Sequence, residues 1–235
     1  MTDCKRIASD MPRSFCSVCI VLCGPSGSGK TTIGKKLAEI LCIAYEEGDE
    51  YHSDANICKM SQGIPLSDAD RIPWLTRLRE EVILAYKNKG RNVVLACSAL
   101  KKIYRDILCG SNQRFKAGGG NVQRGHTVVS SFSSKFNNVF FVMLTGSIDL
   151  IARALVMRKN HFMPPSLLRS QFSILEPLQL PNDGESYEAT EVGMNIDLDR
   201  LSDTNAVVDV IKKRILKDYR SSFFSFDSAA AKGNL

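Results

Sequence analysis

The chain has 235 residues, 44% of them hydrophobic and 24% charged, with a formal net charge of +6. This composition fits one globular domain with appended segments, and no apolar run approaches the roughly 20 residues of a membrane-spanning helix. Because the basic residues are scattered and are not interleaved with aromatic residues, the charge does not indicate a nucleic-acid partner.

The eight cysteines are typical of buried free thiols, because most of them lie in or beside apolar segments. Cys16 and Cys19 form a Cys-x-x-Cys pair, but residues three apart on a strand point to opposite faces, which makes a poor metal site. We therefore expect a reduced, cytoplasmic protein.

An apolar run at residues 17–23 predicts the first strand and leads directly into the string CGPSGSGKTT. Gly24, Gly29, Lys30 and Thr31 fit the phosphate-loop pattern Gly-x-x-x-x-Gly-Lys-[Ser/Thr] without a mismatch. Glycines allow backbone N–H groups to turn around phosphate oxygens, the lysine adds a positive charge, and the threonine hydroxyl suits Mg²⁺. The loop therefore predicts a bound nucleoside triphosphate. The residues expected to bind it are Gly24, Pro25, Ser26, Gly27, Ser28, Gly29, Lys30, Thr31 and Thr32.

Further strand-like runs follow at residues 43–46, 92–97, 138–144 and 188–196, with helical patterns between them. The helical pattern directly after the loop places the phosphates at a helix N-terminus, where anions are favoured. Repeated alternation of strands and helices predicts an α/β fold with three layers: a mostly parallel five-stranded sheet with helices on both faces.

A helix after Pro73 has the clearest amphipathic pattern, and proline suits a first helical turn. Its apolar face is expected to comprise Leu75, Leu78, Val82 and Ala85. Its solvated face is expected to comprise Arg77, Arg79, Glu80 and Glu81.

Three segments lack such patterns and are expected to lie outside the core. Residues 110–137 are rich in Gly, Ser, Asn and Gln and predict a surface insertion. Residues 1–15 are expected to form an N-terminal extension and residues 221–235 a loose C-terminal tail. The domain is therefore expected to span residues 16–220.

A phosphate loop is shared by several classes of protein, and the rest of the sequence narrows the choice. The only Asn-Lys pair, Asn88-Lys89, is not followed by the x-Asp of a guanine-binding motif. The strands at 92–97 and 138–144 end without the acidic residue typical of an ATPase. The acids follow the second strand instead, and Asp49 is expected to face the γ-phosphate, because the carboxyl ends of parallel strands share one crevice.

Three further blocks, together with the phosphate loop, resemble the gluconokinase family, whose architecture is related to that of shikimate and adenylate kinases. The blocks are GDEYHSDANICKMSQGIPLSDADRIPWL, CSALKKIYRDIL and RKNHFMPPSLLRSQFSILEPL, and they cover most of residues 17–180 in the family's order. The resemblance implies a phosphate-loop kinase fold with a helical lid. It also implies phosphorylation of D-gluconate to 6-phospho-D-gluconate with ATP and Mg²⁺, and a homodimer.

Phosphoryl transfer needs positioning and charge neutralisation, and the sequence supplies candidates for both. Lys30 and Asp49 are the first catalytic candidates, with Asp49 orienting the attacking hydroxyl and accepting its proton; the alternative is a helix-capping aspartate. Thr31 and Glu47 are the candidates for the metal, with Glu47 at a position where related kinases tend to have aspartate.

Gluconate carries a carboxylate and hydroxyls, so its pocket should contain cations and hydrogen-bonding groups. The candidates for this pocket, beside Asp49, are His52, Lys59, Arg71, Lys101 and Lys102. Arg71 is favoured, because a planar guanidinium can bind a carboxylate through two hydrogen bonds. Each lysine could equally be a surface residue, and His52 could be a packed or capping residue.

Residues 152–175 resemble the lid of these kinases and contain the last two catalytic candidates, Arg153 and Arg158. Because five residues on an ideal helix separate their directions by about 140°, a bend or helix end is needed for both to reach phosphates. Arg158, at the expected helix end, is favoured.

Two other functions remain open. The same fold could phosphorylate another acceptor, such as a shikimate-like acid or a nucleoside monophosphate. Alternatively, the chain could be a regulatory protein that binds nucleotide without transferring phosphate.

Overall fold

The computed structural model describes residues 17–111, 138–157, 167–180 and 191–219. The expected N-terminal extension at 1–15, the C-terminal tail at 221–235 and nearly all of the insertion at 110–137 lie outside the described residues. Within them, no helix is both long and apolar enough to cross a membrane.

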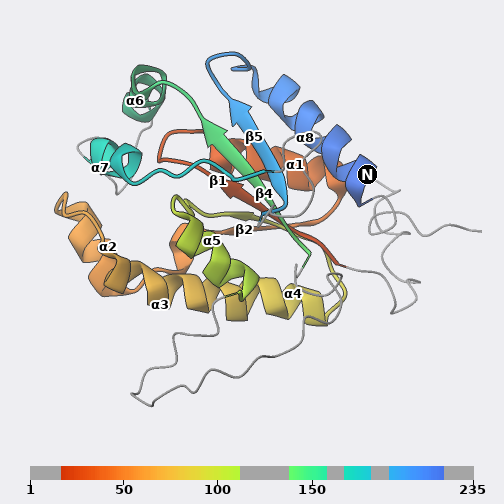
Figure 1. Cartoon of the computed structure of the whole chain (residues 1–235), viewed down its shortest axis with the longest axis horizontal. Helices are drawn as coiled ribbons and strands as arrows, with labels where there is room; N and C mark the ends of the chain where they lie inside the picture. Colours follow the sequence, from red (N-terminus) through yellow and green to blue (C-terminus); the bar gives the residue numbers. More distant parts are fainter. Residues whose placement is uncertain (1–16, 112–137, 158–166, 181–190, 220–235) are drawn as a thin grey trace, which may run out of the picture.

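Five parallel strands form the centre of the molecule (Figure 1). They are β1 (Cys19–Cys23), β2 (Ala44–Glu47), β3 (Val93–Ala96), β4 (Val139–Thr145) and β5 (Gly193–Asp197). Their order is β2-β3-β1-β4-β5, so β1, which precedes the phosphate loop, lies in the middle. The α/β fold with a parallel five-stranded sheet is therefore confirmed.

Helices cover both faces of the sheet, which explains why β1 and β4 are apolar on both sides. Alternate residues of β1 belong to opposite cores: Val21 packs with one set of helices and Ile20 with the other. Figure 1 shows α1 (Lys30–Leu41) and α8 (Thr204–Asp218) on one face. The other face carries α3 (Asp68–Leu78), a π-helical turn (Arg79–Leu84), α4 (Ala85–Asn88) and α5 (Lys102–Cys109).

Four shorter elements complete the described part of the chain, and the helices among them lie on one side of the molecule (Figure 1). They are the 3-10 turn η1 (Gly48–Tyr51), α2 (Asp54–Ser61), α6 (Ile148–Val156) and α7 (Leu168–Ser173). Of the expected lid at 152–175, the structure describes residues 152–157 and 167–175, which belong mainly to α6 and α7.

The prediction that Pro73 lies in a first helical turn was wrong. Helix α3 begins at Asp68, and Ser67 caps it in a reciprocal pair: the Ser67 Oγ accepts from the Asp70 N–H, and the Asp70 carboxylate accepts from the Ser67 N–H. Pro73 therefore lies inside the helix. The capping box, and not the proline, marks the start of this helix in the sequence.

The expectation of a fully solvated polar face on this helix was wrong at one residue, Arg79. Arg77, Glu80 and Glu81 are exposed, whereas Arg79 is partly buried. The reason is that its guanidinium lies against Gly110, so closely that a Cβ added there would overlap it.

Candidate active site

The phosphate loop turns sharply between β1 and α1. Gly24, Gly27 and Gly29 have φ angles of 134°, 88° and 84°, which L side chains rarely adopt. At Gly24 there is also no space for a side chain, because a Cβ would lie 2.3 Å from the Leu144 carbonyl oxygen. Lys30 Nζ donates to the carbonyl oxygens of Gly24 and Pro25 at 3.0 and 2.9 Å, which holds its charge across the loop.

The end of β2 brings a carboxylate against the first turn of α1. Glu47 Oε2 accepts hydrogen bonds from Thr31 Oγ1 at 2.9 Å and from the Tyr45 hydroxyl at 2.6 Å. Burial, followed by the bond to Glu47, raises the pKa of Tyr45, so the phenol keeps its proton. Donation by Thr31 leaves its oxygen lone pairs available to a cation.

Thr31 and Glu47 fit Mg²⁺, a hard cation that takes oxygen ligands and is held by few protein groups when phosphates share its coordination. In the part of the chain that the structure describes, no group of three or more His, Cys, Asp or Glu side chains could hold a metal. A site shared with bound phosphates therefore fits these residues better than an all-protein cage does.

A pocket lies beside the loop, with about 450 Å³ of space unfilled by protein atoms inside it and at its open mouth. Five of the residues expected from the sequence line it: Ser26, Lys30, Asp49, His52 and Arg71. Asp49 belongs to η1. This turn packs so close to β3 that a Cβ on Gly48 would lie 2.5 Å from the Ala96 carbonyl oxygen, and only glycine fits there. The remaining lining residues are Met60, Pro65, Leu66, Ser98, Leu167, Ser170 and Gln171.

His52 is a packed histidine that also lines the pocket. Its ring stacks on Trp74 with centroids 4.1 Å apart, and its Nδ1 lies 3.4 Å from the Asn56 side-chain nitrogen. Burial, and then the positive charge of Arg71, lower its pKa to about 4. The ring is therefore neutral near pH 7 and offers the pocket a hydrogen-bonding group without a charge.

The candidate cations separate into two groups. Arg71 is 7% exposed, donates through Nε to the Leu66 carbonyl oxygen and lines the pocket. The three lysines do not line it and are paired with carboxylates of their own. These ion pairs are Lys59–Asp70 at 2.6 Å, Lys101–Asp68 at 2.8 Å and Lys102–Asp106 at 2.8 Å.

The lid candidates are only partly visible. Arg153 is exposed on α6, where its Nε donates to the Asp149 carbonyl oxygen at 3.3 Å. The favoured residue, Arg158, lies outside the described residues.

Gln171 of α7 is a site residue that the sequence reasoning missed. It is 3% exposed, its Oε1 accepts from the Ser26 N–H at 2.7 Å, and its Nε2 donates to Ser26 Oγ at 3.1 Å. Gln171 lies within the block RKNHFMPPSLLRSQFSILEPL, but no periodicity distinguishes it from its neighbours. Its contacts join α7 to the phosphate loop.

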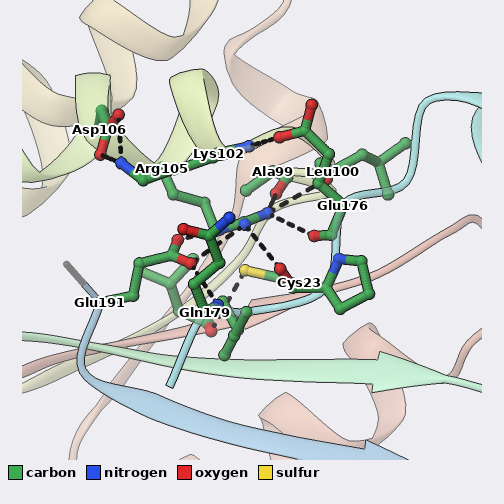
Figure 2. Close-up of polar contacts among 12 residues, drawn as sticks. Cys23, Ala99, Leu100, Lys102, Arg105, Asp106, Glu176, Gln179 and Glu191 are labelled. Atoms are coloured by element: carbon green, nitrogen blue, oxygen red, sulfur yellow. Dashed lines mark hydrogen bonds and ion pairs between the residues drawn. The ribbon is translucent and has the colours of Figure 1, made fainter. Parts of the chain in front are cut away.

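Arg105 of α5 is a second missed residue, and Figure 2 shows its polar contacts. Its guanidinium is 1% exposed and pairs with Glu191, which is also buried. It donates to four backbone carbonyl oxygens, those of Ala99, Leu100, Glu176 and Pro177.

The network around Arg105 supports the strained turn beside the phosphate loop. Ala99 has a φ of 35°, a region that L residues rarely adopt. The preceding residue, Ser98, accepts a hydrogen bond from the Gly24 N–H at 3.0 Å through its carbonyl oxygen. Arg105 thereby ties the segment that follows α7 to the backbone that holds the start of the loop.

The parallel sheet, the phosphate loop and the acid-bearing turn after β2 define the class of protein: a phosphate-loop kinase. A solved structure of a gluconokinase from Sinorhizobium meliloti 1021 superimposes with a TM-score of 0.63 at 31% identity, over 88% of this chain and 96% of that one. No model of a known protein family matches the chain.

Curated relatives agree with that structure. A protein of Mus musculus named "Probable gluconokinase" is 42% identical over 193 residues, which are 82% of this chain and 97% of that protein. The "Thermosensitive gluconokinase" of Escherichia coli K12 is 37% identical over 197 residues, 83% of this chain and 90% of that protein. The chain therefore belongs to the gluconokinase family, which confirms the resemblance.

Proposed function

We propose that this chain transfers the γ-phosphoryl group of ATP to D-gluconate, giving 6-phospho-D-gluconate and ADP. The observation that carries the proposal is the pocket in which Asp49, Lys30 and Arg71 converge. A base, a phosphate-binding cation and a carboxylate-binding cation are the groups that this reaction needs. The names of the curated relatives support gluconate as the acceptor.

Each residue has a role that follows from its chemistry. Lys30 and the backbone N–H groups of the loop bind the triphosphate. Thr31, with Glu47 beside it, would hold Mg²⁺, which would neutralise charge on the phosphate oxygens. Asp49 orients the attacking hydroxyl and accepts its proton.

The acceptor is recognised at the other side of the pocket. Arg71 binds the gluconate carboxylate through its planar guanidinium. His52, neutral near pH 7, hydrogen-bonds a substrate hydroxyl. Arg153 and Arg158 are assigned to the lid, where an arginine that reaches the transferring phosphate contributes several powers of ten to turnover, about 10³ to 10⁵ in other phosphoryl-transfer enzymes. We propose a smaller contribution to substrate binding from the three lysines, because each would have to leave its carboxylate partner to contact substrate. They are Lys59, Lys101 and Lys102.

A panel of acceptors tests the proposal. The full chain is incubated with ATP and Mg²⁺ and either gluconate, shikimate or a nucleoside monophosphate, and ADP and the phosphorylated product are measured. We expect turnover with gluconate and background with the others. Turnover with another acceptor and none with gluconate would contradict the proposal.

Asp49→Asn separates an enzyme from a protein that only binds nucleotide. We expect the variant to keep its nucleotide affinity and to lose about 10²- to 10⁴-fold in kcat, the usual contribution of a general base. Measurement of kcat together with ATP-analogue binding checks both parts. A variant that keeps wild-type kcat would remove Asp49 from the mechanism.

The same proposal includes a cytoplasmic homodimer. Molar mass from light scattering after size-exclusion chromatography would give twice the chain mass of 26.0 kDa. A monomer at working concentrations would contradict the dimer and leave the chemistry intact.

A further inference from the structure

Glu47 lies at the end of β2, and its orientation decides whether it can serve a cation beside Thr31. A glutamate side chain has three rotatable bonds, so one hydrogen bond from Thr31 leaves it considerable freedom. The structure adds a second donor, the Tyr45 hydroxyl, only 2.6 Å from the same carboxylate oxygen. Because both donors use Oε2, neither of them occupies Oε1.

The ring of Tyr45 is seated by α1. Its Cε2 lies so close to Gly34 that a Cβ there would come within 2.7 Å of it. Gly34 is three residues after Thr31, so the two lie on the same face of the helix. The Lys35 ammonium group, 5.7 Å from the ring centroid, contacts the same ring. The glycine thus makes room for the phenol directly beside the hydroxyl of Thr31.

We propose that Tyr45 is a positioning residue for the metal: its hydroxyl holds Glu47 in the orientation that serves Mg²⁺ at Thr31. This inference rests on the metal site of the proposed function. It predicts that loss of the hydroxyl weakens metal binding while the acceptor pocket keeps its properties.

The residue before Glu47 on β2, Glu46, provides a matched control for the Tyr45 substitution. Glu46 accepts a hydrogen bond from the Tyr86 hydroxyl at 2.7 Å and another from Tyr51 at 2.9 Å. Adjacent residues of a strand point to opposite faces, so this second tyrosine–glutamate pair lies away from Thr31. Tyr86, on α4, therefore offers a control: Tyr86→Phe removes the same chemical group from a glutamate of the same strand without touching the metal position.

The experiment measures metal binding directly. Mn²⁺ is titrated into the full chain in the presence of a non-hydrolysable ATP analogue, and free Mn²⁺ is followed by electron paramagnetic resonance. Loss of one hydrogen bond to a charged group is expected to raise the Mn²⁺ Kd of Tyr45→Phe about tenfold. Tyr86→Phe should leave it unchanged.

Two further measurements keep the result interpretable. Gly34→Ala displaces the ring without removing the hydroxyl, and it should weaken Mn²⁺ binding in the same direction. In activity assays, Tyr45→Phe should raise the Mg²⁺ concentration needed for half-maximal rate and leave the KM for gluconate unchanged. A general structural defect would move both, and it would also lower the thermal unfolding midpoint.

The inference is overturned if Tyr45→Phe binds Mn²⁺ as tightly as the wild type, or if Tyr86→Phe loses as much affinity. Because the titration uses no acceptor, its result is independent of the identity of the substrate. A wild-type chain that fails to phosphorylate gluconate would contradict the proposed function, and a weakened Mn²⁺ site in Tyr45→Phe would still support the role of Tyr45.

Discussion

Arg71, which the sequence already favours because of its guanidinium, also differs from the other candidate cations in its position in the structure. The blocks that resemble gluconokinases contain four candidate cations for the acceptor pocket, and three of them pair with aspartates outside the pocket lining. Arg71 instead lies with its guanidinium 5.8 Å above the Tyr104 ring and lines the pocket. Because Arg71 is buried in the pocket lining, we expect its substitution to weaken gluconate binding more than substitution of any of the three lysines.

Arg71→Lys tests that role. Because lysine cannot bind a carboxylate in the two-bond geometry of a guanidinium, the KM for gluconate should rise about tenfold or more, with a smaller change in kcat. Steady-state kinetics with gluconate varied at saturating ATP measure this. The matched control is Arg77→Lys on the same helix, since Arg77 is exposed and pairs with Glu81. Equal kinetics for the two variants would argue against carboxylate binding by Arg71.

At the scale of an element, α7 is connected to the phosphate loop through one buried amide. Gln171 contacts both the backbone N–H and the hydroxyl of Ser26. A buried N–H that loses its acceptor costs about 1–3 kcal/mol, which converts to roughly a tenfold change in binding. We therefore expect the loss of this contact to affect both α7 and the phosphate loop.

Gln171→Met keeps the size of the side chain and removes its hydrogen bonds. We expect the Kd for an ATP analogue to rise about tenfold, measured by isothermal titration calorimetry. Ser173→Ala on the same helix should leave it unchanged, because Ser173 Oγ bonds only a helix carbonyl, that of Ser170, among the contacts found in the described residues. An unchanged Kd for Gln171→Met would show that α7 and the loop are not coupled in this way.

For the whole molecule, the buried His52 links stability to pH. Its pKa is about 4 in the folded chain and near 6.5 in an unfolded one, so the unfolded state binds the extra proton between these values. Stability from this group is complete above pH 6.5 and is lost as the pH falls toward 4. The slope is at most about 1.4 kcal/mol per pH unit.

Urea denaturation of wild type and His52→Gln at several pH values measures this contribution. The wild type should lose stability more steeply between pH 6.5 and 4, and the two curves should run parallel above pH 7. Parallel curves throughout would show that His52 titrates normally in the folded protein.

The sheet and the loop could be predicted because their signals are local. The apolar runs that form β1 and β4 and the string from Gly24 to Thr31 each lie within a few consecutive residues. The start of α3 is also encoded locally, in the capping box of Ser67 and Asp70. The prediction placed the start at Pro73 instead, because proline is common in a first helical turn. Local patterns of this kind need no knowledge of distant partners.

The pairing of distant residues could be decided only by the folded chain. Gln171 meets Ser26 across 145 residues, and Arg105 meets Glu191 across 86. No spacing rule connects such pairs, because a sheet of order β2-β3-β1-β4-β5 brings together strands that are not neighbours in the chain. The sequence therefore identified the phosphate-binding chemistry and the candidate acid, while packing decided which cation, amide and phenol stand beside them.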